Sequence, residues 1–453
     1  MLSMSASTLL CGAAKRCITP PDDLFPLPKN ASGIAFGGVL DALHVRALAI
    51  ESKGTRALLL SFDLGGVPLP DRFLPLISER TGVLQQNILY FAVHTHTSPN
   101  AGRPDPDPTR VPTPETEKKH RAYLQLLETQ MLAAAEEAVA SLRPARLGIG
   151  YGKSYINVNR NQMYRTRHAD GTETVECALG VNPEGPSDKT LFVAAFEDPD
   201  GRPIAFLVNY AVHAVVMHAN RCFGDLMAIS GDIPGNVCSL LEENHPGAVA
   251  LWSSGAAGDQ NAVMMNQIYL PDPKTGARTV STIEGGDANM LRTLVCRHLD
   301  DIEQVIRHIQ CETIDPLLTA AVDVASVPGR NVIPVDPKRP RGECTYSYED
   351  AAPYEVRMQL LRLGDLAFVA LSGELYTRLG LHLRAVSPLQ DTVLITHCAN
   401  CCEINGRVIN NGYIYDDEAM ADGAFGSRRT RMQPGYIRQA LEKTMLSLFK
   451  NAQ

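Results

Sequence analysis

The stretch LYFAVHTHTSPN, residues 89–100, is an apolar run that ends in two histidines and then in turn-forming residues. Residues 88–93 are short, β-prone and bounded by turn residues, which predicts a buried strand. Histidine is the commonest metal ligand, so a strand ending in His94 and His96 is a candidate metal site, although such pairs are also typical of polar strand ends. We expect the two imidazoles to point to opposite sides, one toward a metal and the other toward a neighbouring pocket.

The composition is that of a soluble globular protein with a large core. The chain has 453 residues, of which 45% are hydrophobic and 20% charged. Its net charge is −8 and it has no Lys/Arg block, so nucleic acids and anionic membranes are poor candidate partners. No apolar run is long enough for a secretion signal or a membrane span. We therefore expect a cytoplasmic protein that acts on a small molecule without stable membrane association, with a homo-oligomer as an open alternative.

Of the eleven cysteines, only Cys398, Cys401 and Cys402 form a cluster in the sequence. Their spacing would allow a soft metal or a redox pair. We favour reduced, partly buried thiols, as is usual in the cytosol.

The hydrophobic pattern predicts an α/β fold of mixed β-sheets covered by helices, in a single large catalytic domain that spans residues 1–453. Strands are predicted at residues 9–18, 43–51, 56–64, 88–93, 147–155, 204–216, 249–252, 357–363, 366–371 and 393–396. Helices are predicted at residues 115–142, 230–241, 287–309, 375–386 and 434–450. Residues 264–285 and 328–350 are rich in turn-forming residues and are predicted to be loop-like.

Several apolar strands end in a polar or ionisable residue followed by small turn residues. These residues are Asp63, His94, His213, Asp259 and Glu374. Each one alone is typical of a hydrogen-bonded strand end, but five in one chain indicate a shared cleft. Two histidines and one glutamate are enough to hold a catalytic zinc with an open position for water.

A set of short motifs follows one order along residues 10–435. The motifs are GAAK at 12–15, ITP at 18–20, HTH at 94–96, NR at 159–160, NYAVH at 209–213, SGD at 230–232, GD at 258–259 and SGE at 372–374. This ordered set resembles the neutral/alkaline non-lysosomal ceramidase superfamily. The resemblance implies a catalytic domain similar to the N-terminal domain of the neutral ceramidases.

The resemblance also implies a set of metal ligands. In that family a zinc ion is held by two histidines, a glutamate and a tyrosine. Carried over to this chain, the ligands are His94, His213, Glu374 and Tyr413, with Tyr415 as the competing tyrosine. Zinc lowers the pKa of water toward neutrality and so supplies a nucleophile at physiological pH.

Three further roles follow from the same resemblance. His96 is expected to contact the substrate and to carry a proton to the leaving group. Arg160 is expected to bind a carbonyl or carboxylate, with a surface ion pair as the alternative. Tyr413, besides binding the metal, would stabilise a tetrahedral oxyanion, with a packed core hydroxyl as the alternative. Gln260 is a third candidate for contact with the substrate.

Other polar residues are given supporting or neutral roles. Asp63 and Asp232 are expected to orient the imidazoles, with a second metal bound through them as an alternative. Four histidines are expected to be ordinary polar residues of the surface or the core: His44, His218, His245 and His397.

Two departures from the family limit the expected substrate. The turn GDQN at 258–261 lacks the serine that ceramidases carry there, and the ceramidase C-terminal β-domain is expected to be absent. We therefore predict a zinc-dependent hydrolase that cleaves the amide (C–N) bond of a small soluble N-acyl substrate with metal-activated water. The alternatives are an esterase or lactonase at the same metal, and a non-catalytic metal- or ligand-binding relative.

Overall fold

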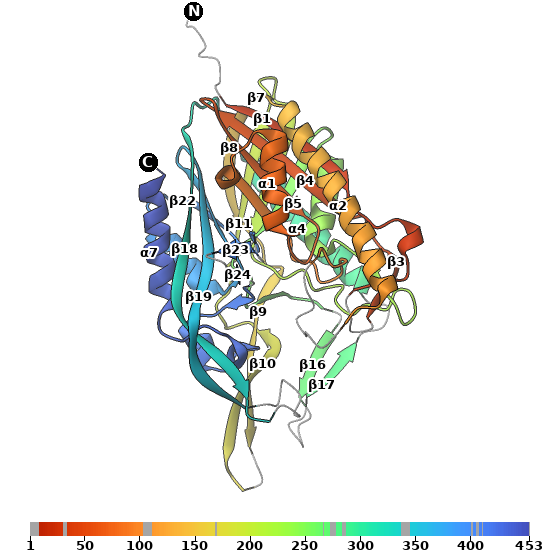
Figure 1. The fold of residues 1–453 in the computed structure, drawn as a ribbon, viewed down its shortest axis with the longest axis vertical. Coiled ribbons are helices and arrows are strands. Elements are labelled where there is room, and N and C mark those ends of the chain that lie inside the picture. Colours follow the sequence, from red (N-terminus) through yellow and green to blue (C-terminus); the bar gives the residue numbers. More distant parts are fainter. Residues whose placement is uncertain are drawn as a thin grey trace, which may run out of the picture.

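The computed structural model describes most of the chain (Figure 1). The described residues are 9–29, 34–102, 111–167, 170–265, 267–271, 278–282, 287–336, 345–399, 402–404, 407–409 and 411–452. None of the helices in these ranges is both long and apolar enough to span a bilayer.

The first sheet is formed mainly by the N-terminal strands. In spatial order it contains β6 (Ile88–Ala92), β5 (Thr55–Phe62), β4 (His44–Ser52), β1 (Leu10–Cys17) and β7 (Arg143–Pro144). Its outer face is covered by α2 (Pro114–Ala140), against which α1 (Pro70–Thr81) packs (Figure 1). The helix α2 buries the stripe that its periodicity predicts: Tyr123, Leu127, Met131, Ala134 and Ala138.

The second sheet stacks against the first. In spatial order it contains β14 (Val249–Ser254), β12 (Pro203–Tyr210), β11 (Thr190–Glu197) and β8 (Arg146–Lys153). The strand β14 contacts β4, β5 and β6 of the first sheet, so the two sheets share one core. The helices α3 (Asp232–Asn244) and α4 (Asp287–Ile306) cover the opposite face.

The third sheet belongs to the C-terminal part of the chain. In spatial order it contains β18 (Leu318–Pro334), β19 (Tyr346–Leu363), β20 (Leu366–Leu371) and β22 (Asp391–Ile395). It is covered by α7 (Ile437–Asn451), with α5 (Thr377–Val386) packed beside α7 and β22 (Figure 1).

Smaller elements complete the fold. They are β2 (Leu27–Pro28), β3 (Ala35–Val39), β9 (Asn157–Arg167), β10 (Glu173–Asn182), β13 (Met227–Ile229), β15 (Gln260–Ala262), β16 (Gln267–Pro271), β17 (Arg278–Thr282), β21 (Glu374–Leu375), β23 (Cys402–Ile404), β24 (Arg407–Ile409), β25 (Tyr413–Ile414), α6 (Asp417–Ala421) and the 3₁₀ turns η1 (Asp22–Leu24), η2 (Gln85–Asn87) and η3 (Ser427–Arg429). The β9–β10 hairpin projects away from the stacked sheets (Figure 1).

Each of the three sheets contains one pair of parallel neighbours: β5 with β6, β12 with β14, and β20 with β22. Backbone hydrogen bonds join the ends of these pairs across the sheets. Thr396, after β22, donates to the carbonyl oxygen of Ser254 in β14, and Ala92 of β6 donates to that of His397. The carboxyl ends of strands from all three sheets therefore meet in one place.

The predicted fold class is confirmed, because mixed sheets covered by helices form the described structure. Three local predictions were wrong. Residues 264–285 contain the β16–β17 hairpin, and much of 328–350 belongs to the β18–β19 hairpin. Both hairpins are held by ladder hydrogen bonds, which the hydrophobic pattern does not reveal. The strand predicted at 204–216 ends at Tyr210, whose carbonyl oxygen accepts a hydrogen bond from Gly255.

A buried histidine in the second sheet's core predicts a pH-dependent stability. His298 of α4 is fully buried, and its Nδ1 lies 2.8 Å from Ser154 Oγ. Burial lowers the pKa of His298 from 6.5 to about 3. Because the unfolded chain takes up this proton at a higher pH than the folded chain, the free energy of unfolding falls as the pH drops from about 6.5 toward about 3, by up to about 1.4 kcal/mol per pH unit.

Urea denaturation of the wild type and of His298→Gln, at about pH 7 and about pH 5, checks this expectation. The glutamine does not titrate, so we expect the variant to lose less stability than the wild type over this interval. An equal loss in both proteins would contradict the assignment of His298.

Candidate metal centre

The first histidine of the site stands just after β6. His94 lies two residues beyond the end of that strand, and its backbone is in the left-handed region with φ of 66°. Its ring Nδ1 is 2.8 Å from the carbonyl oxygen of Gly65. A carbonyl oxygen only accepts hydrogen bonds, so Nδ1 is the donor in this contact, and in the neutral ring Nε2 is left with its lone pair.

The second histidine follows β12 and is held in the same manner. Nδ1 of His213 lies 2.6 Å from the carbonyl oxygen of Ala257 and 3.1 Å from that of Gln260. Its Nε2 therefore also keeps a lone pair. Burial, with smaller effects from neighbours such as Arg160, lowers the pKa of His213 to about 4, so the ring is neutral at pH 7.

Both Nε2 atoms face one carboxylate oxygen. Glu374 Oε2 lies 3.1 Å from His213 Nε2 and 3.5 Å from His94 Nε2. Burial acts to raise the pKa of Glu374, but attraction to His94 and His213 holds it well below its usual range. Three possible ligand atoms thus converge, and imidazole and carboxylate are the ligand types that zinc prefers. The residues present fit a metal ion.

The tyrosine predicted as a ligand is placed beside the glutamate by a short parallel bridge. Glu374 of β21 and Tyr413 of β25 are register partners. The Tyr413 hydroxyl lies near Glu374 and Arg160, and burial raises its pKa to about 12. Tyr415, the competing candidate, donates its hydroxyl proton to the carbonyl oxygen of Phe425 instead.

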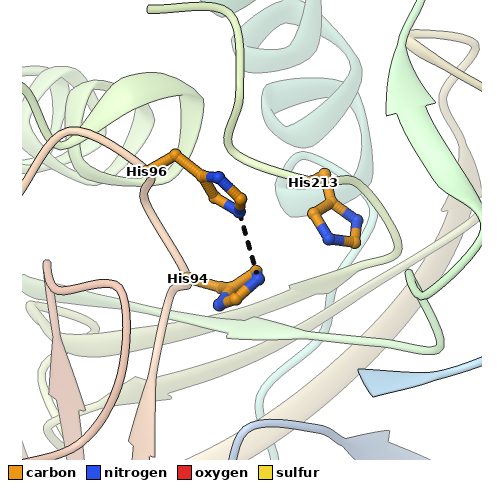
Figure 2. Close-up of side chains that lie close together, drawn as sticks. All are labelled: His94, His96 and His213. Atoms are coloured by element: carbon orange, nitrogen blue, oxygen red, sulfur yellow. Dashed lines mark hydrogen bonds between the residues drawn. The ribbon is translucent and has the colours of Figure 1, made fainter. Parts of the chain in front are cut away.

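His96 lies in the same cluster, which corrects one expectation. Its Nε2 is 3.3 Å from that of His94, and Figure 2 shows both rings turned toward His213. Donor atoms of the three histidines lie within 4.8 Å of one another. The expectation that the two imidazoles point to opposite sides was wrong. Residues i and i+2 of a strand lie on the same face, and here the strand has already ended at Ala92, before either histidine. His96 is close enough to accept a proton from this site or to be a further ligand.

Arg160 is buried, and the alternative of a surface ion pair does not apply. This β9 residue is 4% exposed. Its guanidinium donates to the carbonyl oxygen of Gly258 at 2.7 Å and to Asn261 Oδ1 at 3.2 Å, and lies 5.1 Å from the centre of the Tyr413 ring. Its Nε has no hydrogen-bond partner in the described structure, which leaves one donor for a ligand.

Gln260 occupies a supporting position. Its side chain is fully buried, accepts from Ser187 and donates to Thr377 and the carbonyl oxygen of Pro186. Its own carbonyl oxygen faces His213 Nδ1. The structure thus makes Gln260 a positioning residue for His213, and its contact with substrate stays a prediction.

The roles expected for Asp63 and Asp232 were wrong. Asp63 accepts from Arg46 at 2.7 Å, in a buried network that continues to Glu242. Asp232 accepts from the backbone amides of Met217 and Ile233. Neither carboxylate is hydrogen bonded to a site imidazole, because backbone carbonyls already orient the rings, and neither belongs to a cluster of metal-binding groups in the described residues.

Two of the histidines that we expected to be ordinary polar residues border the site. His397 follows β22, is 2% exposed, and stacks on His94 with 4.0 Å between ring centres and 13° between planes. His218 meets His96 edge-on at 5.4 Å. The signal for His397 was present, since it ends an apolar strand as His94 does. His44 and His245 lie outside the cluster: His245 pairs with Glu303.

The stacked ring of His397 predicts a graded effect on metal affinity. An aromatic contact contributes about 0.5–1.5 kcal/mol, so His397→Ala should weaken zinc binding about two- to tenfold by freeing the His94 ring. His397→Phe retains a flat ring and should bind zinc almost as the wild type does. Competition with a chromophoric chelator measures both affinities, and equal binding by all three proteins would contradict a positioning role.

The cysteine cluster is only partly described. Cys398 is a buried thiol in no disulfide, and burial raises its pKa. Cys401 and the side chain of Cys402 lie outside the described residues, so the alternatives for this cluster stay open.

Comparison with known proteins shows a similarity of fold. No family model and no curated protein matches the sequence. Among solved structures, a neutral ceramidase from Pseudomonas aeruginosa matches with a TM-score of 0.68 and 16% identity, over 99% of this chain and 75% of that one. The chain has a neutral ceramidase-like fold. A structure described as a ceramidase complexed with C2 gives the same TM-score, with 15% identity over 98% of this chain and 76% of that one. The ceramidase-like fold thus extends over nearly the whole length of the chain.

Proposed function

We propose that this protein is a zinc-dependent amidohydrolase that cleaves a C–N bond in a small N-acyl substrate. The observation that carries the proposal is the convergence of His94 Nε2 and His213 Nε2 on Glu374 Oε2, at 3.5 and 3.1 Å. The ceramidase-like fold supports amide cleavage by analogy.

The residues that would hold the metal are His94, His213, Glu374 and Tyr413. Zinc, when bound, would act as a Lewis acid and would lower the pKa of a bound water toward neutrality. The chain contributes orientation: carbonyl oxygens fix both imidazoles, and the register of β21 with β25 fixes Glu374 beside Tyr413.

The remaining groups suit the charge and proton changes of acyl transfer. The Nε2 of His96 is within hydrogen-bonding distance of the site, and its pKa is lowered by burial, so it is neutral at pH 7 and can accept a proton. It would pass that proton to the leaving group. Arg160 and the Tyr413 hydroxyl are the donors beside Glu374, and they would bind the substrate carbonyl oxygen as negative charge develops on it.

An ester or lactone would meet the same groups, so the experiment must compare both linkages. Purified protein is stripped with a chelator, reloaded with zinc, and assayed with short N-acyl amides and the matching esters. The proposal predicts amide hydrolysis that requires zinc and is lost in His94→Ala and Glu374→Ala. Ester hydrolysis alone would assign the esterase alternative, and zinc binding without turnover would assign a non-catalytic binder. Activity retained in either variant would place the chemistry elsewhere.

A further inference from the structure

A cavity lies beside the metal centre, and none of the proposed metal ligands lines it. It has a volume of about 550 Å³, within the usual range for small-molecule sites. Its walls come from β9, from the segment that follows β10, and from the residues around α6. Two of its lining residues, Asp259 and Tyr376, adjoin the segments that position His213 and Glu374.

The cavity is acidic. It is lined by five carboxylates and one cation: Glu184, Asp259, Asp416, Glu418, Asp422 and Arg378. Among the ion pairs of the described residues, Glu418 is the one of these carboxylates paired with an arginine outside the lining, at 3.2 Å from Arg438. Asp259 already accepts hydrogen bonds from Asn159, Gln260 and Thr377. Asp416 is 2% exposed and one of its oxygens accepts from the backbone amide of Ala419, at the start of α6. Glu184 and Asp422 are exposed, so the opening carries negative charge.

Two buried polar atoms of the wall have no partner in the described structure. Tyr376 is 1% exposed and its hydroxyl makes no hydrogen bond. Its ring is fixed by Tyr415 at 4.8 Å and Tyr413 at 6.2 Å between centres. Asn161 Oδ1 is likewise unpaired. An unsatisfied buried polar group costs about 1–3 kcal/mol, which a ligand would remove by supplying hydrogen bonds.

We propose that this cavity binds a small organic cation that carries primary ammonium groups. An ammonium group has three donors and no acceptor, which complements carboxylates, an amide oxygen and a phenol oxygen. A metal ion fits less well, because the histidines form the one converging set of metal-binding groups among the described residues and these carboxylates do not share a point. A molecule with more than one donor spans the separated acceptors.

Calorimetric titration with 1,5-diaminopentane tests the proposal, with 1,5-pentanediol and glutarate as the neutral and anionic molecules of the same length. The diamine should bind once per chain with a dissociation constant below about 1 mM, and the other two should show no binding. Binding is measured without substrate or metal, so its failure would leave the proposed function untouched.

Two variants locate the site. Glu184→Gln with Asp422→Asn removes charge from the opening and leaves the helix-capping Asp416 in place. Tyr376→Phe removes a hydroxyl that has no partner, so the variant should unfold at the same or a higher temperature. Each variant should bind the diamine about tenfold more weakly, whereas Glu79→Gln on the exposed face of α1 should bind as the wild type does. Equal affinity in the wild type and the double variant, equal weakening by Glu79→Gln, or no diamine binding would overturn the proposal.

Discussion

Replacing His213 with alanine should remove bound zinc and reduce hydrolysis by at least about 1,000-fold, because a Lewis acid contributes several kcal/mol and each 1.4 kcal/mol is a factor of ten. The His213 ring is 1% exposed, held by two carbonyl oxygens and directed at Glu374. Zinc per chain by mass spectrometry and turnover of an N-acyl amide are the two measurements.

Matched variants separate the loss of a ligand from a loss of packing. His213→Asn keeps a buried polar side chain and should lose zinc as the alanine variant does. His245→Ala removes a histidine that pairs with Glu303 away from the cluster, and should retain zinc and activity. Wild-type zinc content in His213→Ala would exclude this residue as a ligand.

Replacing Arg46 with alanine should lower the free energy of unfolding by about 3–5 kcal/mol. Arg46 is 1% exposed and donates to Asp63 at 2.7 Å and to Glu242 at 2.9 Å, both of which are buried. Removing the guanidinium leaves Asp63 without a counter-charge. Glu242 then keeps Lys15 as its remaining cationic partner. Breaking a buried ion pair is costly because the remaining carboxylate is cut off from both its partner and water.

Denaturation in urea at pH 7 measures the effect of the Arg46 substitution. Arg46→Lys keeps the charge but loses the two-pronged geometry, so its stability should lie between those of the wild type and the alanine variant. Arg56→Ala breaks the partly exposed pair with Glu51 on the neighbouring strand and should cost less than about 1 kcal/mol. A loss below about 1 kcal/mol in Arg46→Ala would mean that the network contributes little.

The parts of the site that follow from the sequence are those fixed by strand ends. An apolar run predicts a strand and a turn residue predicts its end, so the placement of His94, His213 and Glu374 near strand ends was predictable. Their distances were not, because they depend on how three separate sheets stack. The direction of the His94 ring depends on a left-handed backbone that its neighbours do not indicate.

The same strand-end pattern also misled. It assigned Asp63 to the site, although the charged residue that neutralises it, Arg46, stands in the middle of an otherwise apolar strand and was the better signal. It was not applied to His397, which ends β22 and packs on His94. The β18–β19 hairpin was missed in part because its distal half is largely exposed, so its sequence lacks the apolar contrast on which strand prediction depends.

Anomalous diffraction at the zinc absorption edge, from crystals of the zinc-loaded protein, tests the metal centre most directly. We expect one strong peak at about 2.0–2.2 Å from Nε2 of His94, Nε2 of His213 and a carboxylate oxygen of Glu374. Absence of a peak between these three side chains, or a peak held by His96 with Glu374 turned away, would contradict the proposed coordination.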